Sequence, residues 1–485
     1  MPSRRGVFAI EAVLAFGLFC GGVFGILPRL YATPLLWAHN SNEGWLAVTI
    51  AAWRDGAPLY PGTDQFFVAN YLPLAYVPYR LLEKLFGDCI IAGRWMSWLL
   101  FMVLCCIAFM IVRSAQKSTW AGILGGLFVF STFSIWYTGN LGVAEPQLLG
   151  HVLILLAILL LFRWPESLSG LFAATAMMMA AGLVKPSLFG FPLGLAAWLL
   201  WTRPRLALMW GVICAIAGGI IASILYFSFG ADLFFANVLL GRVYSAHAWL
   251  GNLAVARTII VPLAVCLFFI NTLKSSPQGI FTCFAILGSV VELALTGAAT
   301  GTAFNTGYDL ALATCIGTGL IIGHLHKSKA MGKLTVTGVI LVAAVARVGL
   351  ALMPQISERT LSLETRASLL REDQQTREVI AMLASIPGEV ACTHLSYCYW
   401  AHKPTRIDLY MQPLRFFRPA RDSGGVQQRI ENQSFAAVEH PAAFPWDLRR
   451  FGYEPLFHAD PVVIDSIISV PKREATSPRI PNSFN

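Results

Sequence analysis

The feature that most limits how this chain can fold is a series of apolar runs, each about 20 residues long. A run of that length crosses the hydrocarbon core of a bilayer as one helix. Lipid offers no hydrogen-bond partner, so every spanning backbone must satisfy its own N–H and C=O groups as a helix. About eleven spans are predicted, near 7–27, 90–112, 119–138, 146–163, 168–184, 187–202, 206–228, 255–273, 278–298, 306–324 and 333–353. We therefore expect an α-helical polytopic membrane protein.

The composition agrees with this expectation. Of the 485 residues, 56% are hydrophobic and 13% are charged, whereas a soluble domain carries roughly 25% charged residues. The net charge of +9 fits a membrane protein whose Lys and Arg collect in cytoplasmic loops. We therefore expect membrane lipids, and no nucleic acid, among the partners.

The basic residues also predict an orientation. With the N-terminus inside, the predicted inner connections contain Arg113, Lys117, Arg203, Arg205 and the lysine-rich stretch 324–333, as the positive-inside rule requires. The first apolar run lacks a small-x-small cleavage site, which favours an uncleaved first helix. The sequence thus predicts a multi-pass protein of the cell inner (plasma) membrane, with a cytoplasmic N-terminus and an extracytoplasmic C-terminal part.

The composition changes near residue 354 and divides the chain into domains. Residues 1–353 form the predicted transmembrane domain, and 354–470 form a small extracytoplasmic α/β domain with a helix over 357–385 and a strand over 388–392. The last residues, 471–485, are typical of a disordered tail. Cys392 and Cys398 could pair in an oxidising compartment, but the sequence leaves this pairing open.

A long polar loop between the first two spans holds the first candidate residue. The loop is expected to carry juxtamembrane helices, and Glu43 lies near its start, followed by Gly44 and Trp45. A carboxylate at the mouth of a membrane cavity can take a proton from a hydroxyl group or hold a divalent cation. The alternative is a solvated loop acid.

Four further charged residues stand near the predicted outer surface. Glu145 opens the fourth span, where a helix N-terminus also favours an acid without any ligand. Lys185 interrupts an apolar run and is costly unless it meets an anion, such as phosphate, or extends to the surface. Arg242 is a second outward cation with the same two interpretations. Asp309 should lie one turn inside the tenth span and face a partner, either a substrate group or a neighbouring helix.

The order of motifs carries a resemblance to a known family. An outer acid followed by Gly precedes 54–60 (RDGAPLY), 71–74 (YLPL) and Arg94, and the later stretches 185–187 (KPS) and 305–309 (NTGYD) follow. This order resembles the GT-C superfamily of membrane glycosyltransferases, in the bacterial branch of the lipid A aminoarabinose transferases and protein mannosyltransferases. The chain departs from the family in having Glu43 where Asp is frequent, Leu72-Pro73 where two prolines are frequent, and Val143-Ala144 where an Arg is frequent.

The resemblance implies a function and a set of site residues. It implies transfer of a hexose or pentose from a polyprenyl-phosphate donor to a lipid, polysaccharide or protein acceptor on the outer side, with inversion. Glu43 would be the general base, with or without a divalent cation such as Mg²⁺ or Mn²⁺, and Glu145 a second catalytic acid. Lys185 and Arg242 would bind the donor phosphate. The implied substrate-lining residues are Trp45, Tyr60, Tyr71, Tyr76, Asn305, Tyr308 and Asp309.

Two other functions remain as alternatives. A transporter or flippase of a lipid-linked envelope precursor would need acids or broken helices near the middle of the membrane. For this alternative the sequence offers Glu11 and Glu292, which we otherwise interpret as helix-packing partners, and the prolines at 186 and 192. A structural subunit of an envelope assembly would need none of these residues.

Overall fold

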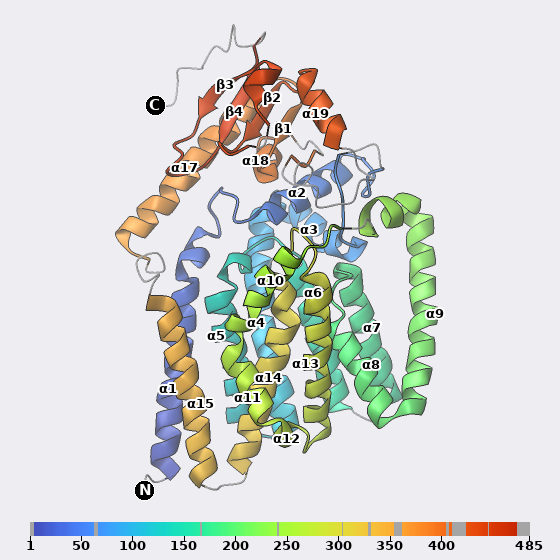
Figure 1. The fold of residues 1–485 in the computed structure, drawn as a ribbon, viewed down its shortest axis with the longest axis vertical. Helices are drawn as coiled ribbons and strands as arrows, with labels where there is room; N and C mark the ends of the chain where they lie inside the picture. The colour runs from blue at the N-terminus through green and yellow to red at the C-terminus, as the bar shows by residue number, and fades with distance from the viewer. Residues whose placement is uncertain are drawn as a thin grey trace.

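The computed structural model describes residues 4–62, 66–164, 167–239, 242–302, 304–327, 331–353, 361–403, 407–409, 423–444 and 446–472. Over these residues the chain forms a tall helical bundle, with a small domain at the end opposite the N-terminus (Figure 1). The longer helices of the bundle are α1 (Arg4–Ala32), α4 (Cys89–Gln116), α5 (Thr119–Trp136), α6 (Gln147–Arg163), α7 (Leu168–Val184), α8 (Gly190–Thr202), α9 (Pro204–Phe229), α13 (Pro277–Thr296), α14 (Tyr308–Lys327) and α15 (Met331–Leu352). The predicted polytopic α-helical fold is confirmed.

Every predicted span falls on helix, but the helices differ in length. Among the described residues, seven helices are long and apolar enough to cross a membrane. The helices α6, α7 and α8 have 17, 17 and 13 residues. At 1.5 Å per residue they reach about 20–26 Å, less than the ~30 Å hydrocarbon core.

The predicted span 255–273 is a broken element rather than one helix. It comprises the end of η3 (Ala254–Thr258), which continues α10 (Ala246–Leu253), followed by α11 (Ile260–Phe268) and α12 (Ile270–Leu273). The axis bends by 73° between the α10–η3 segment and α11. Pro262, in the first turn of α11, lacks the N–H that a continuous helix would need at this point. Counted as one span, this bent pair brings the number of candidate spans to eight.

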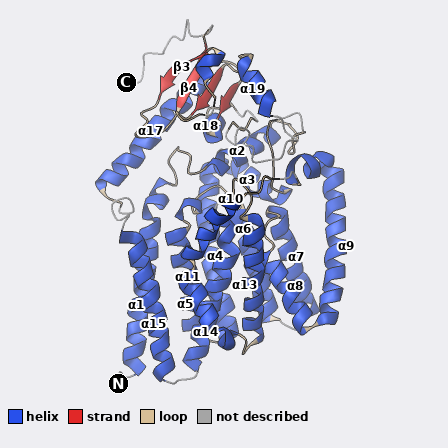
Figure 2. Ribbon diagram, viewed as in Figure 1, coloured by secondary structure: helices blue, strands red, loops and turns tan. Residues whose placement is uncertain are grey.

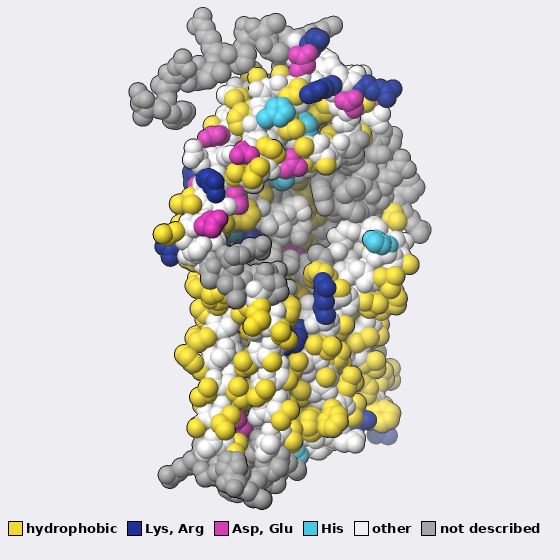
Figure 3. Space-filling view, turned by 60° about the vertical axis from the view of Figure 1, so that its left-hand side comes forward, with side chains coloured by type: hydrophobic (Ala, Val, Ile, Leu, Met, Phe, Trp, Pro, Cys, Tyr) yellow, Lys and Arg dark blue, Asp and Glu magenta, His cyan; other side chains and the backbone are white. Residues whose placement is uncertain are grey.

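The bundle surrounds α14 and leaves α9 at its edge. Of the apolar window of α14, 94% is buried, whereas the corresponding share for α9 is 6%. Figure 1 shows α9 standing apart from its neighbours. In Figure 3, apolar side chains cover the face of the bundle, and most charged side chains gather on the small domain above it. An apolar surface of this kind is what a helical bundle presents to the lipid of a membrane.

The first outer loop contains the two expected juxtamembrane helices, α2 (Ser41–Arg54) and α3 (Pro73–Phe86). The Asn40 side chain caps α2 by accepting hydrogen bonds from the amides of Asn42 and Glu43, at 2.9 and 3.3 Å. Pro73 occupies the first turn of α3, and Gly87 ends this helix with a φ of 81°. The Asn40 cap fixes the start of α2, where Asn42 and Glu43 lie in the first turn.

The C-terminal domain is a small α/β unit. Its sheet has the order β1-β2-β4-β3, in which β1 (Val390–Cys392) and β2 (Ala437–His440) are parallel, while β4 (Ile467–Pro471) is antiparallel to β2 and to β3 (Tyr453–His458) (Figure 2). Its helices are α17 (Leu363–Ser385), α18 (Leu395–Trp400) and α19 (Ser423–Glu431). The predicted helix and strand are thus confirmed as α17 and β1. The predicted tail lies outside the described residues from position 473 onward.

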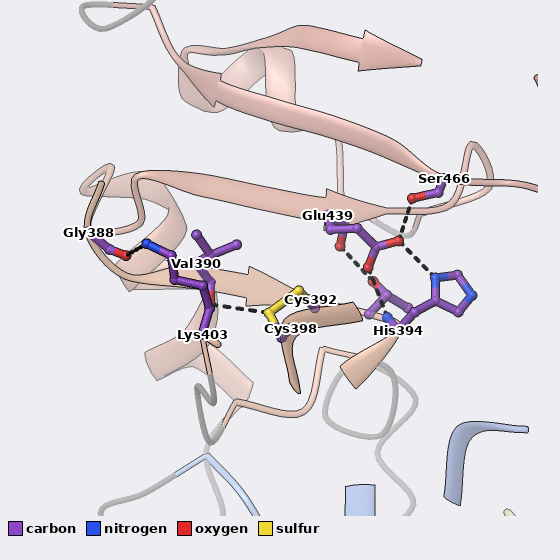
Figure 4. Close-up of a disulfide and its surroundings, with 9 residues drawn as sticks. Gly388, Val390, Cys392, His394, Cys398, Lys403, Glu439 and Ser466 are labelled. Carbon is purple, nitrogen blue, oxygen red and sulfur yellow. Dashed lines mark hydrogen bonds and ion pairs between the residues drawn. A yellow bond between two sulfur atoms is a disulfide. The ribbon is translucent and has the colours of Figure 1, made fainter. Parts of the chain in front are cut away.

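Two local networks hold β1 and α18 together (Figure 4). Cys392 at the end of β1 forms a disulfide with Cys398 in α18, which answers the question that the sequence left open. The fully buried Glu439 carboxylate of β2 accepts hydrogen bonds from His394 Nδ1 at 2.8 Å and Ser466 Oγ at 2.8 Å. Burial alone would lower the pKa of His394, but the Glu439 carboxylate outweighs it and raises that pKa.

Helix α18 also docks the C-terminal domain onto the first outer loop. Gly44 of α2 lies against the backbone of Ser396, and a Cβ at position 44 would overlap it. Trp400 Nε1 donates to Asp88 Oδ2 at 2.9 Å, and the Cys89 amide donates to the Tyr399 hydroxyl at 3.2 Å. The domain is therefore fixed above the segment that carries Asn42 and Glu43.

Candidate active site

A cavity of about 420 Å³ lies where the bundle meets the C-terminal domain. Segments far apart in the sequence form its walls: α2, the loop before α3, the residues before α6, the α7–α8 turn, the segment after α9, and the facing ends of α13 and α14. Thr393, Leu395 and Asp408 contribute from the C-terminal domain. The charged residues that line it are Glu145, Lys185, Arg242, Glu292 and Asp408.

Glu145 and Lys185 meet in this cavity. The Glu145 side chain is 4% exposed, and its Oε1 accepts a hydrogen bond from Asn305 Nδ2 at 2.9 Å and lies 3.5 Å from Lys185 Nζ. Lys185 also donates to Gln147 Oε1 at 2.5 Å. Since Glu145 is bonded to these side chains rather than to the first amides of α6, capping does not explain it. The chain folds a carboxylate, an ammonium and two amides into one polar cluster.

Glu43 occupies a different place from the one predicted. Its side chain is fully buried and forms a bidentate pair with Arg94: Oε1 to Nε is 2.8 Å and Oε2 to Nη2 is 2.7 Å. The two oxygens also accept hydrogen bonds from the amides of Ala144 and His39, at 3.0 and 3.1 Å. The carboxylate is not on the cavity wall, so this geometry does not fit a general base or a metal ligand.

The other N–H groups of the Arg94 guanidinium hold the segment 33–37, which leads from α1 to α2. Nη1 donates to the carbonyls of Thr33 and Leu35, and Nη2 donates to the carbonyl of Trp37. With the two bonds to Glu43, these contacts use all five guanidinium N–H groups. We call the buried Glu43–Arg94 pair the clamp. It fixes the segment from which Asn42 reaches the cavity wall.

Arg242 and Tyr71 line the cavity beside Lys185, as expected from the sequence. The ammonium of Lys185 lies 5.8 Å from the centre of the Tyr71 ring, a distance suited to a cation–π contact. The two cations come from the α7–α8 turn and from the segment after α9. An anion that enters the cavity can meet positive charge from both.

The predicted aromatic residues divide between the wall and the packing behind it. Trp45 lines the cavity, whereas Tyr60 and Tyr76 lie behind it at 4% and 0% exposure. The Tyr60 hydroxyl donates to the Tyr71 carbonyl at 3.0 Å, and the Tyr60 and Tyr76 rings meet edge to face. Tyr60 and Tyr76 are thus corrected from lining residues to supports of Tyr71.

Tyr308 and Asp309 are also corrected. The Tyr308 ring packs edge to face against Phe133 and Tyr137, each at 4.8 Å between ring centres. Asp309 is 1% exposed, with Oδ1 2.8 Å from His151 Nε2. Asp309 faces the interior and pairs with a neighbouring helix, which is the alternative that the sequence offered. Asn305, by contrast, does line the cavity.

Two buried polar atoms on the cavity wall have no hydrogen-bond partner among the described residues. They are Trp45 Nε1 and Asn70 Oδ1. A buried donor or acceptor without a partner costs about 1–3 kcal/mol, so such atoms mark positions that a polar ligand would satisfy. Sugar hydroxyls, which both donate and accept, match this pair.

Several wall residues escaped the sequence prediction. Asn42, Asn70 and Gln147 line the cavity and lie within two residues of predicted site residues in the chain, but amides are too common in loops to attract attention. Glu292 was interpreted as a packing residue, although it too reaches the cavity. Its position near the end of an apolar run was the available signal.

No group of three His, Cys, Asp or Glu side chains suited to a metal occurs in the part of the chain that the structure describes. Arg94 occupies both oxygens of Glu43, and the Lys185 ammonium stands beside Glu145. Since these cations take the places that a metal ion would need, the residues present do not fit a resident Mg²⁺ or Mn²⁺.

Comparison with solved structures finds this fold in proteins that include ArnT and AglB. ArnT from Cupriavidus metallidurans matches with a TM-score of 0.58 and 10% identity, over 97% of this chain and 100% of that chain, and has also been solved with undecaprenyl phosphate. The oligosaccharyltransferase AglB from Archaeoglobus fulgidus, in complex with an inhibitory peptide and a dolichol-phosphate, matches with a TM-score of 0.52 and 9% identity, over 98% and 75% of the two chains. No family model and no curated protein sequence matches this chain.

Proposed function

Starting from the GT-C fold that this chain has, we propose that it is a membrane glycosyltransferase. It moves a hexose or pentose from a polyprenyl phosphate to a lipid, polysaccharide or protein acceptor on the extracytoplasmic side of the plasma membrane. The observation that carries the proposal is the polar cavity in which the Glu145 carboxylate lies beside the Lys185 ammonium. Two proteins of the same fold have been solved with a polyprenyl phosphate bound, which supports this class of donor.

The donor phosphate binds between Lys185 and Arg242. Both residues line the cavity, and a phosphate group suits them because Lys and Arg form charge-assisted hydrogen bonds with its oxygens. Negative charge grows on the phosphate as it leaves the sugar. Fixed cations aimed at that charge stabilise the transition state more than the ground state.

Glu145 is the general base. It takes the proton from the acceptor hydroxyl, whose oxygen then attacks the anomeric carbon opposite the leaving phosphate and inverts its configuration. The Lys185 and Asn305 side chains donate hydrogen bonds to Glu145 Oε1 and hold the carboxylate in place. Neither oxygen of Glu43 is available for this step, because Arg94 holds both.

The sugar lies against Trp45 and the amides of the wall. An aromatic face next to the unpartnered Trp45 Nε1 and Asn70 Oδ1 offers one apolar and two polar contacts to a sugar ring. These contacts orient the anomeric carbon towards Glu145. Orientation of this kind contributes to the rate because it fixes the attack geometry in advance.

A transporter or flippase is less well supported. Glu292 lies in the last turns of α13, and Asp309 in the first turn of α14. Both acids therefore lie near the outer ends of their helices and not near the midplane, where a carrier would need them. A fluorescent polyprenyl-phosphate sugar placed in one leaflet of reconstituted liposomes distinguishes the two functions. A flippase moves the lipid to the other leaflet, whereas a transferase leaves the lipid where it is and passes on the sugar.

The donor site is tested by binding of a labelled polyprenyl phosphate to the purified protein in lipid nanodiscs. Lys185→Met and Arg242→Met should each weaken binding about tenfold or more, since each removes one charge-assisted contact worth about 1.5–3 kcal/mol. Glu145→Gln should bind normally. The matched control is Lys84→Met, which removes an exposed lysine of α3 on the same side of the bundle. Equal binding by all four variants would refute the assignment of the donor phosphate.

A further inference from the structure

Three titratable side chains that the mechanism above does not use lie in a row beside the cavity. Glu292 of α13 lines the cavity at 3% exposure. Its carboxyl group lies next to that of Asp309 in α14, since Glu292 Oε2 and Asp309 Oδ2 both lie against Gly190. Asp309 Oδ1 lies 2.8 Å from Nε2 of the fully buried His151 in α6. The row therefore runs from the cavity into the bundle, with Glu292 at its open end.

The N-terminus of α8 brings the two carboxyl groups to one point. The Gly190 amide donates to Glu292 Oε2 at 3.1 Å, and the Phe191 amide donates to Asp309 Oδ2 at 3.2 Å. A Cβ at position 190 would overlap both of these oxygens. Since two carboxylates cannot approach so closely when both are charged, the packing requires a proton between them.

The close contacts within the row fix how many protons it holds. His151 Nδ1 lies 2.9 Å from the carbonyl oxygen of Gln147, which can only accept, so Nδ1 carries a hydrogen. The contact between His151 Nε2 and Asp309 then needs one proton, and the contact between Asp309 and Glu292 needs a second, because carboxylates only accept. The Glu292 and Asp309 carboxylates contribute two negative charges, and the two protons cancel them. The row therefore has a net charge of zero, the state that burial favours.

The other charged groups that line the cavity with Glu292 are Lys185, Glu145, Arg242 and Asp408. Neither α8 nor the rest of α13 contains a charged residue. A neutral acid therefore stands in the same cavity as the two cations assigned to the donor phosphate. It is separate from the base, Glu145.

We propose that Glu292 is a catalytic acid that gives its proton to the departing lipid phosphate, and that Asp309 and His151 are positioning residues that keep it protonated. This inference rests on the proposed function. In the step, the bond between the anomeric carbon and the phosphate oxygen breaks while the bond to the acceptor oxygen forms. The acceptor proton passes to Glu145, and the Glu292 proton passes to a phosphate oxygen. The phosphate leaves as a monoanion, Glu145 becomes neutral and Glu292 becomes a carboxylate, so the total charge is unchanged.

The proton matters because the free lipid phosphate would otherwise leave as a dianion. The second pKa of a phosphate monoester is about 6, so a carboxylic acid held neutral beside it is a suitable donor. General acid catalysis contributes about 10²- to 10⁴-fold in rate.

The test combines two variants of the row with a matched control. Glu292→Gln keeps the size and hydrogen bonding of the side chain but has no proton to give. Asp309→Asn removes the neighbouring carboxylate, so Glu292 should lose its proton at lower pH. The control is Glu11→Gln, because Glu11 is a 1% exposed acid in α1 whose partners are Trp120 and His326, none of which lines the cavity.

Two measurements decide the outcome, namely the pH dependence of transfer and the infrared band of protonated carboxyl groups in the full-length protein in membranes. We expect Glu292→Gln to lower kcat about 10²- to 10⁴-fold, to abolish the loss of rate at high pH and to remove one carboxylic acid from the infrared band. Asp309→Asn should shift the loss of rate to lower pH, and Glu11→Gln should leave the wild-type profile unchanged.

The inference and the proposed function fail in different ways. If wild-type protein transfers sugar and Glu292→Gln transfers it with the same rate and pH profile, the acid role of Glu292 is wrong and the proposed function stands. An infrared band that does not change in Glu292→Gln would also overturn the acid role. If wild-type protein transfers sugar from no polyprenyl-phosphate donor, the proposed function fails and the acid role fails with it.

Discussion

The clamp between Glu43 and Arg94 gives the sharpest test of the structure, because the sequence assigned Glu43 a different role. The perturbation is a double-mutant cycle with Glu43→Met, Arg94→Met and the double variant. Both side chains are fully buried, and removing one partner of a buried pair leaves an uncompensated charge that costs about 3–5 kcal/mol. Arg94→Met also leaves the carbonyls of Thr33, Leu35 and Trp37 without a guanidinium donor.

The double variant removes both charges at once. Its loss of unfolding free energy should therefore fall short of the sum of the two single losses by about 0.5–3 kcal/mol, the range found for side chains in direct contact. The free energies are measured by reversible denaturant titration of the purified protein in detergent micelles. Two single losses below about 1 kcal/mol, or losses that simply add, would show that the pair is not the clamp described here.

Transfer activity separates the two roles of Glu43. If Glu43 only shapes the wall, the double variant should keep more activity than either single variant, since it restores charge balance. If Glu43 is the general base, every variant at position 43 should be inactive whatever residue stands at position 94, even when the protein is folded.

Three further predictions concern the C-terminal domain and its docking. Gly44→Ala should destabilise the contact between α2 and α18 by about 1–3 kcal/mol, because the added Cβ overlaps the backbone of α18. The control is Gly139→Ala, which should be neutral because its Cβ meets no atom within 4 Å. Limited proteolysis at the domain junction measures the difference between the two variants. Replacing both cysteines of the disulfide by Ala should cost about 2 kcal/mol, from the loop entropy of a sequence separation of 6, and an unchanged melting temperature would contradict this. Domain stability should also depend on pH: the raised pKa of His394 gives stability that is full below its ordinary value of 6.5 and is lost as the pH rises through the raised value. The pKa of Glu439, which burial would raise, is lowered by His394 and gives stability that is present above 4.5 and is lost at lower pH. The protection of the β2 amides, measured as the exchange rate relative to the intrinsic rate at each pH, should therefore be greatest between about pH 4.5 and 6.5. His394→Gln should remove the dependence on the alkaline side.

The sequence was sufficient for the parts of the fold that depend on local signals. Apolar runs located the bundle helices, and the mixed, charged sequence after the last run located α17 and β1 of the C-terminal α/β domain. The break in the span at 255–273 was not predicted, because hydropathy alone does not distinguish one long helix from two that meet at 73°.

The sequence identified those site residues whose charge would be costly in a membrane without a partner. It missed the residues whose role depends on a partner far away in the chain. Lys185 and Glu145 stood out as charges at membrane boundaries, and the fold brings them together. Glu43 was misplaced because its partner, Arg94, lies 51 residues away and turns an apparent loop acid into a buried clamp. Glu292 was missed because its contacts come from α8 and α14, which only the folded bundle brings together.

The central claim is that the cavity around Glu145 transfers sugar from a lipid phosphate. The most direct measurement presents membranes that contain the protein with a panel of radiolabelled polyprenyl-phosphate sugars, with wild type and Glu145→Gln side by side. We predict that label moves from at least one donor to an acceptor with wild type, and that Glu145→Gln binds the donor but transfers at least 10²-fold more slowly. Equal transfer by the two proteins, or no transfer from any donor, would contradict the account.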